Sequence, residues 1–104
     1  MATGTVLQFT TYPGQRDAFV AAFQRAKVFE AASQVEGFRS AQLLVPIDPE
    51  ANHVVVTARW DDETAYGRWL AHPHREAINA GLMQFVTETP AGSMYTIADE
   101  LSSG

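Results

Sequence analysis

The sequence predicts an α+β fold in which a four-stranded antiparallel sheet carries helices on one face. The first observation is the order of the apolar periods, which alternate between strand-like and helix-like segments as β-α-β-β-α-β. The second is a pair of β-rich segments, 38–45 and 53–60, joined by a polar loop, which is typical of a hairpin. The third is the length, since 104 residues suit one core, and we expect residues 1–104 to form a single domain.

The first strand and the first helix are separated by a turn at Pro13 and Gly14. Residues 6–12 are rich in β-forming side chains and predict the strand. From residue 15 to about residue 35, apolar side chains recur at steps of three and four, which predicts one helix. They are Phe19, Ala22, Phe23, Ala26 and Phe29. Gly37 follows at a position where a left-handed helix stop is common.

The second half of the chain completes the pattern. Asp61 and Asp62 follow the third strand and predict the start of a helix that turns Tyr66 and Trp69 toward one side. Pro73 interrupts this helix, and a second short helix is expected over residues 74–81. Residues 93–101 predict the last strand, which gives the split β-α-β order of ferredoxin-like folds.

Both faces of the predicted sheet carry apolar side chains. On the first strand Val6 lies opposite Leu7 and Phe9, and alternation along the second strand places Leu43 opposite Phe38. Helices on one face would leave the other in water, where large apolar patches are rarely tolerated. The simplest cover is a second copy of the chain, packed sheet on sheet, so we expect a homodimer.

Composition excludes several classes of function. The net charge is −5 and the seven basic residues are scattered, so nucleic acid is not an expected partner. The chain has no cysteine, which removes disulfides, thiolate metal sites and cysteine nucleophiles. No apolar run approaches the roughly 20 residues that span a bilayer, and no secretory signal is evident. We expect a cytoplasmic protein with no membrane partner.

Several segments together resemble the antibiotic biosynthesis monooxygenase (ABM) domain family. They are Glu36-Gly37-Phe38, Gln42-Leu43-Leu44, residues 54–66, Trp69 and Pro73. The most specific part is the Gly-Phe before the second strand, combined with the tryptophan that closes the third strand and the acidic helix start. The resemblance implies a ferredoxin-like protomer that pairs into a dimeric α+β barrel. Members of the family oxidise aromatic polyketides to quinones without a cofactor, degrade haem, or bind flavin.

The haem-degrading branch fits poorly. Trp69 matches its tryptophan, but Ile78 or Asn79 stands where the histidine ligand of the iron would be. His72 and His74 come too early in the chain and lie on either side of Pro73.

The quinone-forming branch fits better, because Trp60 and Tyr66 match its tryptophan and tyrosine. Val56 stands where that branch often has an asparagine, so one polar contact is missing. The resemblance therefore implies a monooxygenase that uses O2 and no cofactor on an aromatic polyketide-like substrate, turning an anthrone or phenol into a quinone. Haem- or flavin-dependent oxygenation and a non-catalytic dimeric ligand-binding domain are the alternatives.

The candidate site residues surround an expected pocket between sheet and helices. The predicted catalytic residues are His74, Trp69, Tyr66 and Gln8, and the predicted substrate-binding residues are Phe23, Trp60, Asn79 and Met83. His74 is the best available base, because the pKa of histidine lies near neutrality.

Each of these residues also has a structural interpretation. Trp60 and Trp69 can be core residues, and Gln8 has a pocket role only if it faces the helices. The acids at 61–63 are explained by helix capping, so no metal site is expected.

Overall fold

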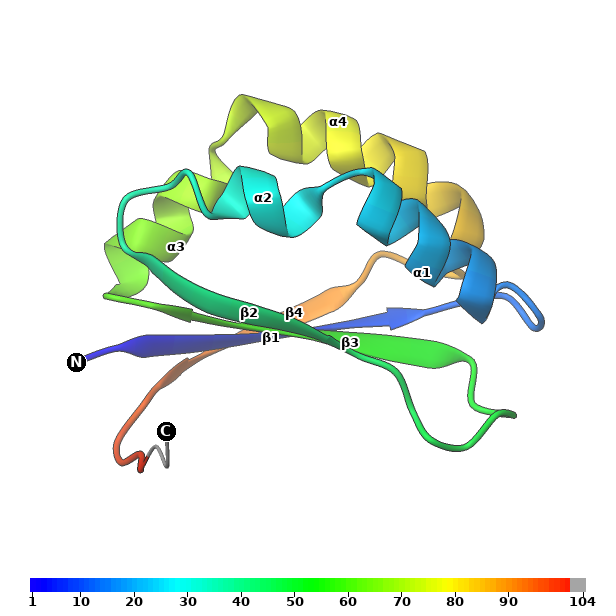
Figure 1. Cartoon of the computed structure of the whole chain (residues 1–104), viewed down its shortest axis with the longest axis horizontal. Coiled ribbons are helices and arrows are strands. Elements are labelled where there is room, and N and C mark those ends of the chain that lie inside the picture. The colour runs from blue at the N-terminus through cyan, green and yellow to red at the C-terminus, as the bar shows by residue number, and fades with distance from the viewer. Residues whose placement is uncertain (102–104) are drawn as a thin grey trace.

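A computed structural model describes residues 1–101, and its elements follow the expected order (Figure 1). The elements are β1 (Thr3–Thr10), α1 (Arg16–Arg25), α2 (Val28–Ala32), β2 (Phe38–Leu44), β3 (His53–Trp60), α3 (Glu63–Leu70), α4 (Pro73–Leu82), the 3-10 turn η1 (Met83–Phe85) and β4 (Ala91–Thr96). The strands form one antiparallel sheet in the order β2-β3-β1-β4, and the helices cover one face of it. The predicted ferredoxin-like α+β fold is confirmed.

The centre of the sheet is the pair formed by β1 and β3. Their register runs without a shift from Thr3 opposite Trp60 to Thr10 opposite His53. Because side chains alternate along a strand, the odd-numbered positions of β1 and the even-numbered positions of β3 face the helices. The strand predicted over 53–60 is therefore placed correctly, and it lies in the interior of the sheet because its β-branched residues pack on both faces.

The helix predicted over residues 15–35 is divided into two. The helix α1 ends at Arg25, and α2 starts at Val28 after a left-handed residue, Lys27, with a φ of 55°. This turn redirects the chain so that Phe29 of α2 packs edge-on against Phe23 of α1, with ring centroids 5.2 Å apart. A continuous helix would carry Phe29 along the axis of α1 instead of back toward the sheet.

A bulge in β2 corrects the predicted faces of this strand. The register shifts between Phe38 and Ser40, so one additional residue, Arg39, is inserted against β3. Phe38 is then opposite Trp60 and Leu43 is opposite Val56, and both side chains face the helices. The prediction that Leu43 and Phe38 lie on opposite faces is wrong for this reason.

The ends of the remaining elements differ from prediction by a few residues. The helix predicted over 74–81 is α4, which begins one residue earlier at Pro73. Proline suits this first position because the backbone N–H that it lacks would have no partner within the helix. The last strand is β4, which ends at Thr96 instead of residue 101. Within residues 1–101, no helix is long and apolar enough to cross a membrane.

Gly37 joins the end of the α2 segment to β2 at a crowded point. Its φ is 95°, and a Cβ atom placed there would lie 2.5 Å from the Cβ of Ala65 in α3. Its carbonyl oxygen accepts a hydrogen bond of 2.8 Å from the backbone N–H of Asp61. The next residue, Asp62, caps α3 by accepting from the N–H of Ala65 at 2.9 Å. Glycine at 37 therefore allows α3 to start directly against β2.

We expect Gly37→Ala to lower the free energy of unfolding by about 3 kcal/mol, because a positive φ costs a non-glycine residue about 1–2 kcal/mol and the new methyl group would overlap Ala65. The matched control is Gly14→Ala, since Gly14 also has a positive φ, of 79°, but no atom lies within 4 Å of the added methyl group. Urea denaturation measures both. Equal losses in the two variants would contradict the packing at residue 37.

Candidate active site

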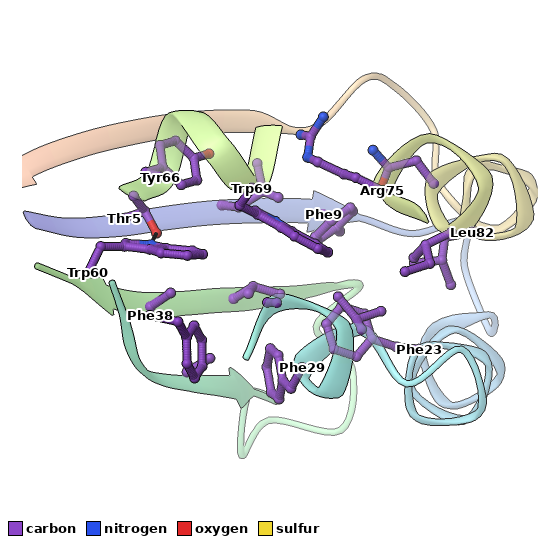
Figure 2. Close-up of a pocket in the computed structure, with 18 residues that line it drawn as sticks. Thr5, Phe9, Phe23, Phe29, Phe38, Trp60, Tyr66, Trp69, Arg75 and Leu82 are labelled. Carbon is purple, nitrogen blue, oxygen red and sulfur yellow. Dashed lines mark hydrogen bonds between the residues drawn. The ribbon is translucent and has the colours of Figure 1, made fainter. Parts of the chain in front are cut away.

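A partly open space, here called the cavity, lies between the helix-facing side of the sheet and the four helices (Figure 2). Its volume is about 60 Å³. The floor comes from the sheet and consists of Thr5, Leu7, Phe9, Phe38, Ala41, Val56, Ala58 and Trp60. The roof comes from the helices and consists of Phe23, Val28, Phe29, Ala32, Tyr66, Trp69, Arg75, Ile78, Asn79 and Leu82. The walls are therefore mainly hydrocarbon and aromatic.

Trp60 forms one end of the cavity and is fixed on every side. It is 1% exposed and packs between Phe38, with ring centroids 5.4 Å apart, and Tyr66, at 5.6 Å. Its indole Nε1 donates a hydrogen bond of 3.2 Å to the hydroxyl of Thr5, so the only polar atom of the side chain already has a partner. In this structure Trp60 forms a wall of the cavity and offers it no free donor.

Four of the polar side chains that line the cavity come from one side of it. Tyr66 and Trp69 lie on α3, and Arg75 and Asn79 lie on α4. None of these four side chains makes a hydrogen bond or ion pair with another group in residues 1–101. Their donors are thus available to a molecule in the cavity, whereas the sheet side is apolar except for the hydroxyl of Thr5, which already accepts from Trp60.

Five of the predicted site residues are brought together. Phe23, Trp60, Tyr66, Trp69 and Asn79 all line the cavity.

Met83 is not among the residues that line the cavity. It lies in η1, just beyond α4, and packs half-buried against the apolar core. Its predicted position at the pocket is wrong because α4 ends one residue before it.

Gln8 lies on the other face of the sheet. Because Leu7 and Phe9 point to the helices, Gln8 points away from them, and its side chain is exposed beside Thr10 and Glu88. The predicted pocket position of Gln8 is therefore wrong. This is the face on which a structural role was expected for it.

His74 also lies outside the cavity. It is exposed and borders a separate groove of about 530 Å³ between α1, α2 and α4, together with Lys27 and Glu30. Its backbone N–H donates to Nδ1 of His72 at 3.2 Å, so His72 caps the start of α4. The predicted pocket position of His74 is wrong because His74 shares with Ala77 and Gly81 the face of α4 that borders the groove.

Arg75 is the cavity residue that the sequence reading missed. The residues of α4 at the cavity are Arg75, Ile78, Asn79 and Leu82, which are spaced as one helical face at steps of three, four and seven. Counting back from the apolar Ile78 and Leu82 along this face would have identified Arg75. Its charge concealed it, because a charged residue in an amphipathic helix is normally assigned to the wet side.

The chemistry of the cavity does not suit haem. Ile78 and Asn79, which occupy the expected ligand position, do line the cavity, and neither is a good ligand for iron. Neither His72 nor His74 reaches it. A volume of about 60 Å³ is well below the roughly 300–1,000 Å³ of typical small-molecule pockets. A haem or flavin ring would need a different arrangement of the helices. Within residues 1–101, no three histidine or acidic side chains gather in a way that could hold a metal ion.

We expect Thr5→Val to lower the free energy of unfolding by about 1–3 kcal/mol, because it leaves the buried indole N–H of Trp60 without an acceptor. Thr11→Val is the matched control, since the Thr11 hydroxyl is buried without a partner and its removal should be neutral or stabilising. Thermal unfolding compares the two. A larger loss from the Thr11 variant than from the Thr5 variant would contradict this assignment.

Residues 4–81 match the sequence profile of the family described as "Antibiotic biosynthesis monooxygenase". No curated protein sequence matches the chain significantly.

Solved structures resemble the whole fold. Rv0793 from Mycobacterium tuberculosis superposes with a TM-score of 0.81 at 20% identity, covering 98% of this chain and 100% of that chain. SnoaB, described as a cofactor-independent oxygenase from Streptomyces nogalater, gives 0.80 at 24% identity over 98% of both chains. NE2512 from Nitrosomonas europaea, a protein of unknown function, gives 0.76 at 17% identity over 99% of this chain and 96% of that chain. At these identities the likeness concerns the fold.

Proposed function

Because the chain belongs to the antibiotic biosynthesis monooxygenase family, we propose that it is a small oxygenase that oxidises an aromatic polyketide-like substrate with O2 and without a cofactor. The observation that carries this proposal is the cavity, whose walls are aromatic and whose free polar groups all lie on the α3 and α4 side. The description of SnoaB as a cofactor-independent oxygenase supports the same reaction type.

The proposed reaction converts an anthrone or phenol into a quinone. A methylene or ring C–H carbon of the substrate gains one oxygen atom of O2 as a carbonyl, and the other oxygen atom leaves as water with two hydrogens from the substrate. The substrate itself supplies the electrons once it has lost a proton. The protein then has to bind the ionised form, exclude water and hold its oxygen.

The cavity residues divide these tasks. Phe23 and Trp60 provide flat apolar surfaces for the rings, and Tyr66, Trp69 and Asn79 provide hydrogen-bond donors for the substrate oxygens. No carboxylate or imidazole belongs to the cavity wall within residues 1–101. We therefore place the chain's contribution in stabilising an ionised substrate and not in a side-chain base.

The substrate needs more room than the cavity has. Phe23, Val28 and Phe29 separate the cavity from a surface hollow of about 160 Å³, because the same three side chains border both spaces. Val28 and Phe29 belong to the five-residue helix α2, which follows the left-handed Lys27. A rotation of Phe29 would join the two spaces, so we place the entrance for the substrate at α2.

Oxygen uptake with an anthrone-like substrate tests the proposed reaction. We expect Trp69→Phe to lower kcat/KM at least about tenfold, because it removes a donor from the cavity while the ring remains. His74→Ala, which alters the neighbouring groove, should retain the wild-type rate. No uptake above background across a panel of anthrones and hydroquinones would reject the oxygenase.

The same cavity could serve a non-catalytic dimeric binding domain, and the small cavity volume and the lack of a base favour this second function. Binding of aromatic ligands without any oxygen uptake would establish it.

We also propose that two copies of the chain pair through the outer face of the sheet. Val6 of β1, Leu44 of β2 and Tyr95 of β4 are all exposed, and the strand register places all three on this outer face. A face of this kind is rarely left in water. The helices cover the opposite face, so the simplest way to bury the outer face is to pack it against the same face of a second copy, related by a two-fold axis. Cytoplasmic location and a place in antibiotic biosynthesis stay predictions.

We expect the protein to sediment at twice the mass of its 11.4 kDa chain, and Val6→Lys to sediment as the monomer because it puts a charge at the centre of the proposed seam. Leu70→Lys makes the same change on α3, on the helix side, and should stay dimeric. A monomeric wild-type protein, or dissociation by both variants, would contradict pairing through the sheet.

A further inference from the structure

Within residues 1–101, Arg75 is the only charged side chain that lines the cavity. No acidic residue lines it, and Arg75 makes no ion pair within residues 1–101. Four of the other arginines each bond to a carboxylate or a backbone carbonyl, namely Arg16, Arg39, Arg59 and Arg68. Arg25 is exposed on α1, where water solvates it. Arg75 is thus a cation placed at an apolar space without a counter-charge.

The position of Arg75 is unfavourable for stability. It is the third residue of α4, and the partial positive charge at the start of a helix disfavours a cation in the first turn. It is also half-buried, so part of its hydration is lost. Figure 2 shows its side chain extending from α4 in the direction of Trp69. Both the helix start and the apolar walls raise the positive potential at the cavity, and an anion bound there would relieve the cost.

We propose that Arg75 binds the ionised oxygen of the substrate, so that the cavity selects phenolates or enolates over their neutral forms. This inference rests on the cavity that the proposed function uses. The guanidinium donates charge-assisted hydrogen bonds, which are roughly twice as strong as those of a neutral donor. The donors of Tyr66, Trp69 and Asn79 reach the same space. Binding therefore lowers the pKa of a phenol in the cavity and increases the fraction of the form that gives up electrons to O2.

The pKa of bound 4-nitrophenol tests this directly, because its ionised form has a distinct absorption band. With protein in excess, we expect the wild-type protein to lower the pKa of the bound probe by about one unit or more relative to water, which is a preference of about tenfold for the phenolate. In Arg75→Met the pKa of the bound probe should rise to the value in water or above it, because the charge is gone and burial opposes the neutral donors that remain. Arg75→Lys should give an intermediate value.

Two controls separate charge from folding and from overall charge. Arg25→Met removes the same charge from an exposed site and should leave the pKa of the bound probe at the wild-type value. The neutral analogue 4-nitroanisole should bind to the wild-type protein and to Arg75→Met with the same affinity, which shows that the cavity of the variant is intact.

Several results would overturn the inference. They are an unchanged pKa of the probe on the wild-type protein, a lowered pKa that survives Arg75→Met, and a failure of the wild-type protein to bind the probe. Tighter binding of 4-nitrobenzoate than of 4-nitrophenolate, lost in Arg75→Met, would reject the phenolate and assign a carboxylate. Failure of oxygen uptake with an intact Arg75-dependent pKa shift would reject only the oxygenase. Uptake together with an unchanged pKa would reject only this inference.

Discussion

The buried indole of Trp60 is the interaction on which the cavity depends. Trp60 is the last residue of β3, and its indole N–H donates a hydrogen bond to the hydroxyl of Thr5 in β1. The ring packs between Phe38 of β2 and Tyr66 of α3. Three strands and the helix that follows them are therefore fixed relative to one side chain. The bulge that turns Phe38 toward the helices supplies one of these contacts, and the glycine before it allows α3 to approach. Trp60 and its neighbours form the rigid end of the cavity.

The other end of the cavity is formed by the short helix α2. Its wall at α2 consists of five helical residues that begin after a left-handed lysine, and Phe29 of this helix separates the cavity from solvent. A packed aromatic end and a short helix at the opposite wall suit the proposed entrance for a flat molecule at α2. The polar side chains of α3 and α4 lie between these two ends, so a ligand would meet apolar walls first and donors at one edge.

Much of the fold could be predicted from the sequence, because periodicity and turn residues report directly on burial. The strand at 53–60 and the capped start of α3 are examples. The break at Lys27 could not be predicted, since nothing local marks a lysine that adopts a left-handed conformation. The site was predicted less well. Trp69 and Asn79 follow the helical faces, but Gln8 was assigned to the cavity although Leu7 and Phe9 already fix the face of β1. Arg75 was overlooked because charge normally signals solvent.

The central claim is that the space under the helices is where an aromatic ligand binds. The chain has two tryptophans, so its spectrum contains two indole N–H signals, which can be followed by NMR while 4-nitrophenol is added. The account predicts that the signal of Trp69 moves together with the backbone signals of Arg75 and Asn79, while those of Gln8 and His74 stay in place. Shifts centred on Gln8 or on the groove beside His74, with Trp69 unchanged, would contradict it.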